Sequence, residues 1–219
     1  MMRNAKQRLI GITALSMVLA GLGQAQQPMP TAGAGAMPPA GAMAPPSRNP
    51  AAAPAGSYKV DLEHSSVVAR VSHRGLSYSV LRFGVRQGSL RWNAARPSDI
   101  ALDVTVDAKP YYAPIVYRIP PEGPQSLNVA RYPDSRFVST AVHPRPGGRA
   151  TIDGRLTLMG VTRPARIDAE LVGVGRSMEG APTIGFTGTM TIDTAEFTQL
   201  PMTKMVGKLT LILDAEFVK

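Results

Sequence analysis

The chain has 219 residues, with 24 basic and 15 acidic side chains, a formal net charge of +9 and no cysteine. Without cysteine there is no disulfide framework, no thiolate metal site and no cysteine nucleophile. The basic residues are scattered and no helix-turn-helix, zinc-finger or stacked-aromatic motif accompanies them, so a nucleic-acid partner is not expected.

The first 25 residues have the pattern of an export signal. Arg3, Lys6 and Arg8 give a basic start, Leu9–Leu22 is an apolar run interrupted by glycine, and Gly23–Ala25 offers small residues for cleavage. The apolar run is shorter than the roughly 18 residues of a spanning helix. We therefore predict a signal peptide over residues 1–25 and a periplasmic or secreted protein, with an uncleaved anchor as the alternative.

Residues 26–57 are rich in Ala, Pro, Gly and Met, with eight prolines and Arg48 as the only charged side chain. Such a segment cannot bury enough apolar surface to offset the entropy of ordering it. We predict a disordered tether over 26–57 and a folded domain over 58–219. Beyond residue 25 the chain keeps 21 basic and 15 acidic residues, a net charge of +6 that weakly favours acidic or membrane-surface partners.

From Tyr58 onward the hydrophobic pattern has the period of two that is typical of β-strands with one apolar face. A phase change near His64–Ser66 predicts a bulge in a long first strand, and Gly84 and Gly88 predict bends in the second. The later strands are expected over Ile100–Val106, Arg136–His143, Arg149–Met159, Pro164–Val174, Ile184–Ile192 and Leu209–Phe217. Met159–Thr162 is expected to form the turn of the central hairpin.

Residues 109–134 lack a sustained period and are rich in Pro and Tyr. A loop of this length in a compact domain is usually functional or partly helical. We predict a lid over this segment, with a short helix near Gln125–Arg131. Tyr111 and Tyr112 are predicted to bind ligand at the lid, since an aromatic ring with a polar tip suits the mouth of a lipid pocket; ordinary loop packing is the alternative.

Eight mostly antiparallel strands are best accommodated as a closed all-β barrel, with a two-sheet sandwich as the alternative. The inward-facing positions are rich in Val, Ala, Gly and Leu, and the whole chain has one Trp and five Phe. This is little bulk to fill a barrel, so a ligand cavity is expected. The predicted lining residues are Phe83, Leu102, Val104, Leu156, Leu158, Ile167, Leu171, Phe186, Met190, Leu209, Leu211 and Leu213.

Four groups of residues follow one another along the chain: Tyr58–Asp61 with His64-Ser65, His73, Gly75 and Phe83; Val129–Pro133 with Phe137; Gly154–Leu158 with Gly160–Pro164; and Gly185-Phe186 with Ile192-Asp193. In this order they resemble the pattern of the YceI family of exported lipocalin-like proteins. The resemblance implies an eight-stranded antiparallel lipocalin-like barrel that binds a polyisoprenoid, an isoprenoid quinone or another long-chain amphiphile. The chain departs from the family pattern at Leu81, at Pro110–Pro114, and at Thr194 and Thr198.

Two alternative sites are weighed against this reading. A hydrolase interpretation is invited by Asp61, Glu63, His64 and Ser65, but neighbouring strand residues point to opposite faces and no Gly-x-Ser-x-Gly motif follows. His64, His73 and His143 have no standard metal-ligand spacing. We therefore expect no catalytic residue, no metal and no cofactor, a bound quinone being a ligand.

The sequence thus predicts a carrier or storage protein for a long apolar ligand. The alternative is a non-lipid binding module, or an envelope assembly or stress factor, that acts through its loops. A homodimer and a transient contact with a membrane surface stay open.

Overall fold

The structure is a computed structural model and describes residues 44–114, 126–198 and 206–219. It places in this part of the chain three short 3-10 helices, η1 (Pro50–Ala52), η2 (Pro97–Asp99) and η4 (Thr194–Glu196). The strands are β1 (Gly56–Val60), β2 (Ser66–His73), β3 (Ser77–Trp92), β4 (Ala101–Asp107), β5 (Asp134–Arg145), β6 (Arg149–Leu158), β7 (Val161–Arg176), β8 (Pro182–Asp193) and β9 (Lys208–Val218). No helix in the described ranges has the length and apolar character needed to cross a membrane.

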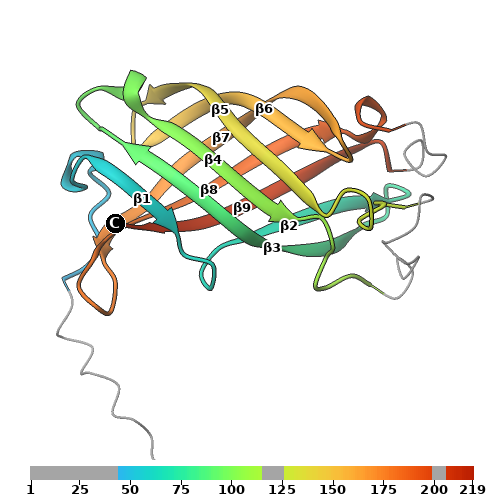
Figure 1. Cartoon of the computed structure of the whole chain (residues 1–219), viewed down its shortest axis with the longest axis horizontal. Helices are drawn as coiled ribbons and strands as arrows, with labels where there is room; N and C mark the ends of the chain where they lie inside the picture. The colour runs from blue at the N-terminus through green and yellow to red at the C-terminus, as the bar shows by residue number, and fades with distance from the viewer. Residues whose placement is uncertain (1–43, 115–125, 199–205) are drawn as a thin grey trace, which may run out of the picture. The chain divides into compact units, whose positions relative to one another are not determined.

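The strands form one antiparallel sheet that closes on itself (Figure 1). From β2 the order runs through β9, β8, β7, β6, β5 and β4 to β3, and β3 pairs back with β2. β1 takes the same position as β2, because it also pairs with both β3 and β9. The described strands therefore fill eight positions of a closed barrel, which confirms the predicted fold class and excludes the sandwich.

The barrel position that β1 and β2 share is interrupted near His64–Ser66, where the sequence predicts a bulge. Lys59 pairs with Ser89 and Ser66 pairs with Gly84, so the chain between them has two residues more than the facing part of β3. β3 itself has a register shift between Val85 and Gln87 against β4. Such irregularities bend a strand and let a sheet curve into a barrel.

The hairpin of β6 and β7 is tighter than predicted. Leu158 pairs with Val161, so only Met159 and Gly160 form the turn, with φ of 51° and 76°. Two central residues with positive φ match the twist of the strands they join, as in type I′ hairpins. β7 therefore begins at Val161 and not at Pro164, where the sequence pattern placed its start.

The N-terminal boundary also differs from the prediction. Ser47 exchanges two backbone hydrogen bonds with Val174 of β7, at 2.8 and 2.7 Å, and Ala53 is buried in the core. A Cβ atom on Gly173 would lie 2.7 Å from Cβ of Pro46, so the glycine allows this close approach. Residues 47–57 thus pack on the barrel and are not a free tether; residues 1–43, including the predicted signal peptide, lie outside the described part.

Only the two flanks of the predicted lid are described. After β4 the chain returns to β3, where the amide of Tyr111 donates to the carbonyl of Arg82 and the amide of Arg82 donates to the carbonyl of Tyr112, both at 3.0 Å. Residues 126–131 form turns in which the amides of Arg131 and Tyr132 donate to the carbonyl of Asn128. The helix predicted over Gln125–Arg131 is therefore not found in its described part, and residues 115–125 lie outside it.

Candidate functional site

The barrel encloses a cavity of about 760 Å³ lined mainly by apolar side chains. Alternate residues of the strands point into it, because successive side chains of a strand face opposite sides of the sheet. Ligand pockets in proteins typically have about 300–1,000 Å³. The interior is therefore not filled by the protein's own side chains and has the size of a binding site.

All twelve residues that the sequence predicts as lining residues lie on the cavity wall. They come from six strands and are Phe83, Leu102, Val104, Leu156, Leu158, Ile167, Leu171, Phe186, Met190, Leu209, Leu211 and Leu213. Their contact with a ligand stays a prediction.

Tyr111 and Tyr112 lie elsewhere. They are 63% and 54% exposed and are not part of the cavity wall, although Pro110 and Ala113 on either side of them are. The hydrogen bonds between this segment and Arg82 hold it along the outer edge of β3. The two tyrosines therefore lie beside the wall and not on it, and their contact with a ligand at the mouth of the pocket stays a prediction.

The sequence reasoning left out several wall residues. Val67, Ala69 and Val71 of β2 line the cavity, as does Trp92 at the end of β3. The alternation of the three β2 residues could have found them. Phe197, which follows η4, also lies on the wall, but it belongs to no strand and has no periodic signal.

A packed aromatic group lies at the end of the barrel where β1 begins. The ring centroids of Trp92 and Phe186 are 5.7 Å apart and those of Phe186 and Phe217 are 6.4 Å apart. Ala53 and Tyr58 belong to the same core cluster. Tyr58 donates to the carbonyl of Pro54 at 2.6 Å, and burial raises the pKa of its phenol. Aromatic side chains thus fill this end of the barrel, while Phe137 and Phe197 belong to a second core cluster.

Charged side chains are paired on the outside of the barrel. Nε of Arg136 on β5 donates to Asp103 on β4 at 2.8 Å, and this hydrogen bond lowers the pKa of the Asp103 carboxyl. Arg86 pairs with Asp107 and Asp134 at 3.1 and 3.3 Å. Both partners of these pairs remain partly exposed, so they keep their hydration. The residues next to them, such as Val104 and Phe137, supply the apolar wall.

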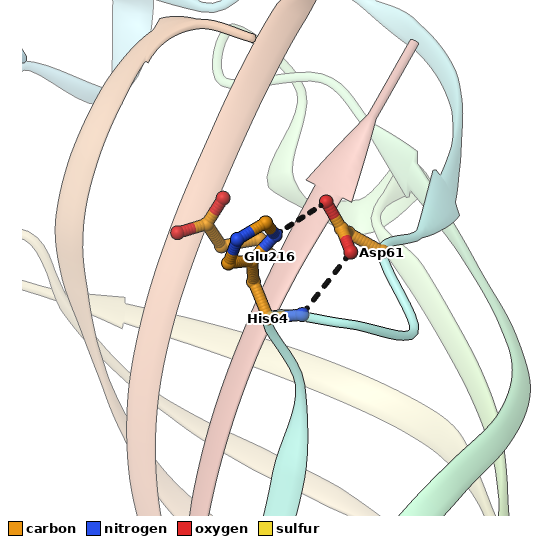
Figure 2. Close-up of side chains that lie close together, drawn as sticks. All are labelled: Asp61, His64 and Glu216. Atoms are coloured by element: carbon orange, nitrogen blue, oxygen red, sulfur yellow. Dashed lines mark hydrogen bonds and ion pairs between the residues drawn. The ribbon is translucent and has the colours of Figure 1, made fainter. Parts of the chain in front are cut away.

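A second cluster of polar side chains lies at the corner between β1 and β2 (Figure 2). Nδ1 of His64 is 2.9 Å from Oδ2 of Asp61, and Glu216 of β9 lies beside the imidazole. The hydrogen bond to His64 lowers the pKa of Asp61, and the same bond raises the pKa of His64. Asp61 also accepts hydrogen bonds from the amides of Glu63 and His64, so it fixes the turn.

This cluster has one imidazole nitrogen and two carboxylate oxygens that all lie within 4.8 Å of one another. Such a set could hold a divalent cation. Sequence reasoning missed this cluster, because Glu216 is distant in the chain from Asp61 and His64 and the only metal pattern considered was the spacing of the histidines. His143 pairs instead with Asp153 at 3.0 Å.

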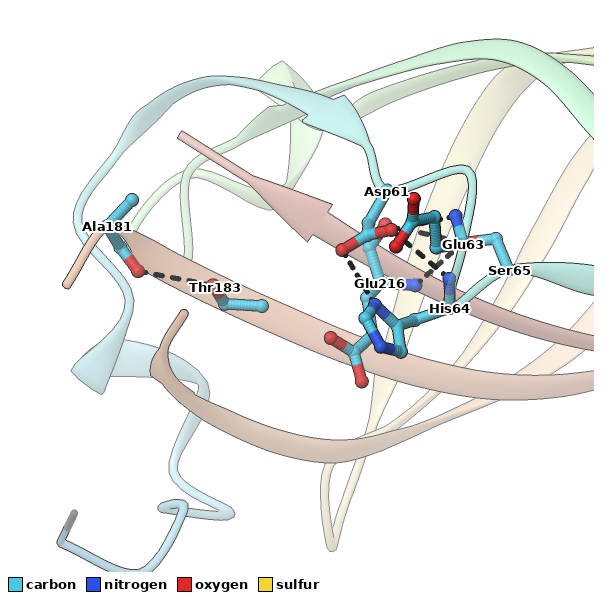
Figure 3. A network of polar contacts seen from close by, with 7 residues as sticks. All are labelled: Asp61, Glu63, His64, Ser65, Ala181, Thr183 and Glu216. Carbon is cyan, nitrogen blue, oxygen red and sulfur yellow. Dashed lines mark hydrogen bonds and ion pairs between the residues drawn. The ribbon is translucent and has the colours of Figure 1, made fainter. Parts of the chain in front are cut away.

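The hydroxyl of Ser65 does not complete a catalytic arrangement with His64 (Figure 3). It accepts a hydrogen bond from the amide of Glu216 at 3.1 Å and lies 3.5 Å from the carbonyl of the same residue. The imidazole of His64 faces Asp61. The geometry therefore gives Ser65 a structural role in joining β2 to β9.

Comparisons with known proteins agree with this fold. The sequence matches the YceI-like domain over residues 58–217. A UPF0312 protein of Shewanella sp. strain W3-18-1 is 36% identical over 151 residues, which are 68% of this chain and 79% of that protein. A UPF0312 protein of Shewanella oneidensis is 35% identical over 151 residues, with the same shares of the two chains.

Two solved structures have a similar fold. BcnA of Burkholderia cenocepacia has a TM-score of 0.58 and 20% sequence identity, and the match covers 72% of this chain and 98% of that one. The YceI protein of Campylobacter jejuni has a TM-score of 0.55 and 21% identity, and the match covers 68% and 90% of the two chains.

Proposed function

The chain belongs to the YceI-like family, and from its apolar cavity we propose that it binds and carries a long-chain amphiphile such as a polyisoprenoid or an isoprenoid quinone. The observation that carries this proposal is the cavity of about 760 Å³ inside the closed barrel. A ligand of this class needs little more than apolar area to bind tightly, because each buried methylene contributes about 0.8 kcal/mol.

The proposal is one of binding and not of catalysis. In the described residues the wall of the cavity is built mainly from Leu, Val, Ile, Ala and Phe. His64 and Asp61 bond to each other in the corner between β1 and β2, and neither is part of that wall. Carriage of an apolar molecule requires shelter from water, which a closed sheet without free edges supplies.

We propose further that the protein acts outside the cytoplasm, in the periplasm or in secreted form. The basic start, the apolar run and the small residues at 23–25 support export. The chain has no cysteine, so export to an oxidising compartment would expose no thiol to oxidation. A carrier in that compartment would move a water-insoluble molecule between membrane surfaces.

The only tryptophan of the chain provides a direct test, because Trp92 lies on the cavity wall. Titration with straight-chain alcohols of increasing length should change its fluorescence. The affinity should rise about fourfold for each added methylene until the cavity is full, and then stay constant. An affinity that does not depend on chain length would refute binding inside the barrel and would favour a protein that acts through its loops.

A further inference from the structure

Four large apolar side chains at one end of the barrel are exposed to solvent. Leu76 is 80% exposed and Tyr78 is 59% exposed, and Tyr111 and Tyr112 are more than half exposed. An exposed group of large apolar residues usually marks a surface that meets another body. Together with Arg70, Arg74 and Arg82, these four residues are called the docking lip below.

The fold brings the docking lip together from two segments of the chain. Leu76 and Tyr78 lie at the turn and start of β3, and the hydrogen bonds to Arg82 hold Tyr111 and Tyr112 along the same strand. The guanidinium of Arg70 lies 4.2 Å from the ring centroid of Tyr78. The docking lip therefore contains one stacked pair of a cation and an aromatic ring, and two more exposed rings lie along the same strand.

The charge of the docking lip is positive. The sequence has no acidic residue between Glu63 and Asp99, while this stretch contains Arg70, Arg74 and Arg82. The three arginines are exposed, and no carboxylate of the described residues pairs with them. Arg86, the next arginine along β3, differs because it is held by two aspartates.

The docking lip continues into the cavity wall. Val71 and Leu81 line the cavity from the inner face of the same hairpin, and Pro110 and Ala113 line it on either side of the two tyrosines. The hairpin that carries the docking lip on its outside therefore supplies part of the cavity wall with its inner face.

We propose that the docking lip binds the surface of an anionic phospholipid bilayer, so that the cavity opens toward the membrane from which the ligand is loaded. Tyrosine is enriched at the level of the lipid head groups, and arginine pairs with phosphate. Anionic lipids attract clustered basic side chains, and the attraction falls with added salt. This inference rests on the proposed function for its purpose, but it is tested without any ligand.

The orientation on the membrane can be measured with single cysteines, since the chain has none of its own. Leu76→Cys and Met178→Cys would each carry an environment-sensitive nitrobenzoxadiazole dye. Met178 is a matched control, because it is 69% exposed and lies in the turn between β7 and β8, at the opposite end of the barrel. Vesicles of phosphatidylcholine with phosphatidylglycerol should brighten and blue-shift the dye at position 76 and leave the dye at 178 unchanged. An equal response at both positions, or a response only at 178, would overturn the proposal.

A charge variant tests the same surface in a different way. Arg74→Gln with Arg82→Gln should weaken vesicle binding about 25-fold, because one basic side chain near an anionic surface contributes about fivefold. Arg48→Gln is the control, since Arg48 is exposed in the segment that packs near Gly148, away from the docking lip. Equal binding of the double variant and the control would refute the docking lip.

The assays also separate this proposal from the proposed function. The double variant should bind farnesol as the unchanged chain does, as measured by Trp92 fluorescence. Loss of vesicle binding with farnesol binding intact supports both proposals. Farnesol binding without any charge-dependent vesicle binding would overturn the docking lip alone, and vesicle binding without farnesol binding would overturn the carrier function alone.

Discussion

Replacement of Val104 by phenylalanine should block part of the cavity. Val104 on β4 is partly buried, lines the cavity and packs against the core cluster that contains Trp92. The substitution adds about four non-hydrogen atoms, which take the place of about four methylene groups of a ligand. At about 0.8 kcal/mol for each methylene, the loss of binding free energy is about 3 kcal/mol, or about 200-fold in affinity.

The assay is a farnesol titration followed by the fluorescence of Trp92. Val172→Phe is the matched control, because Val172 is 53% exposed and is not part of the cavity wall. Circular dichroism should show the same β-structure for both variants. If the folded Val104→Phe chain binds farnesol as tightly as the Val172→Phe chain, the ligand does not occupy the space beside β4 and the reasoning is wrong.

Two further predictions concern stability. Because the pKa of His64 is raised, its protonated form stabilises the fold, and this effect is lost as the pH rises through the raised pKa. Because the pKa of Asp61 is lowered, its ionised form stabilises the fold, and this effect is lost as the pH falls through the lowered pKa. His64→Gln should therefore lower the melting temperature most between the ordinary pKa values of 3.8 and 6.5, and a uniform effect at all pH values would contradict this. In urea unfolding, Gly160→Ala should lower the free energy of unfolding more than Gly75→Ala does. Both glycines have a positive φ, which costs alanine about 1–2 kcal/mol. At Gly160 the Cβ atom would in addition lie 2.6 Å from the ring of Tyr132, whereas at Gly75 it would meet no atom within 4 Å. Equal losses of unfolding free energy in the two variants would contradict this and would show that Tyr132 moves aside freely.

The strands could be predicted because each has one face against the cavity and one in solvent. In β9, Leu209, Leu211 and Leu213 line the cavity and alternate with Lys208, Thr210, Ile212 and Asp214, three of which are polar. This period predicts both the strand and its inward face. The bulge near His64 was also predictable, because the phase of the alternation changes there. The strand residues of the cavity wall follow from this parity, whereas Phe197 lies outside the strands and does not.

Other features depend on contacts that a local pattern does not contain. Residues 47–57 have a composition typical of disorder, yet Ala53 fits into the core and Pro46 lies against Gly173. The Met159-Gly160 turn is shorter than predicted because Val161 pairs directly with Leu158.

Long-range contacts also decide where side chains outside the regular alternation lie. Glu216 reaches His64 only because β9 pairs with both β1 and β2. Tyr111 and Tyr112 lie outside the cavity because their backbone pairs with Arg82, which no alternation in that segment indicates.

Native mass spectrometry of the protein, gently extracted from its own host, tests the central claim most directly. The account predicts a fraction of the protein with a bound amphiphile whose mass corresponds to an isoprenoid or another long-chain molecule, and a lower occupancy for Val104→Phe from the same host. Reproducible absence of any such adduct, with the barrel still folded, would contradict the proposal that its cavity carries an apolar ligand.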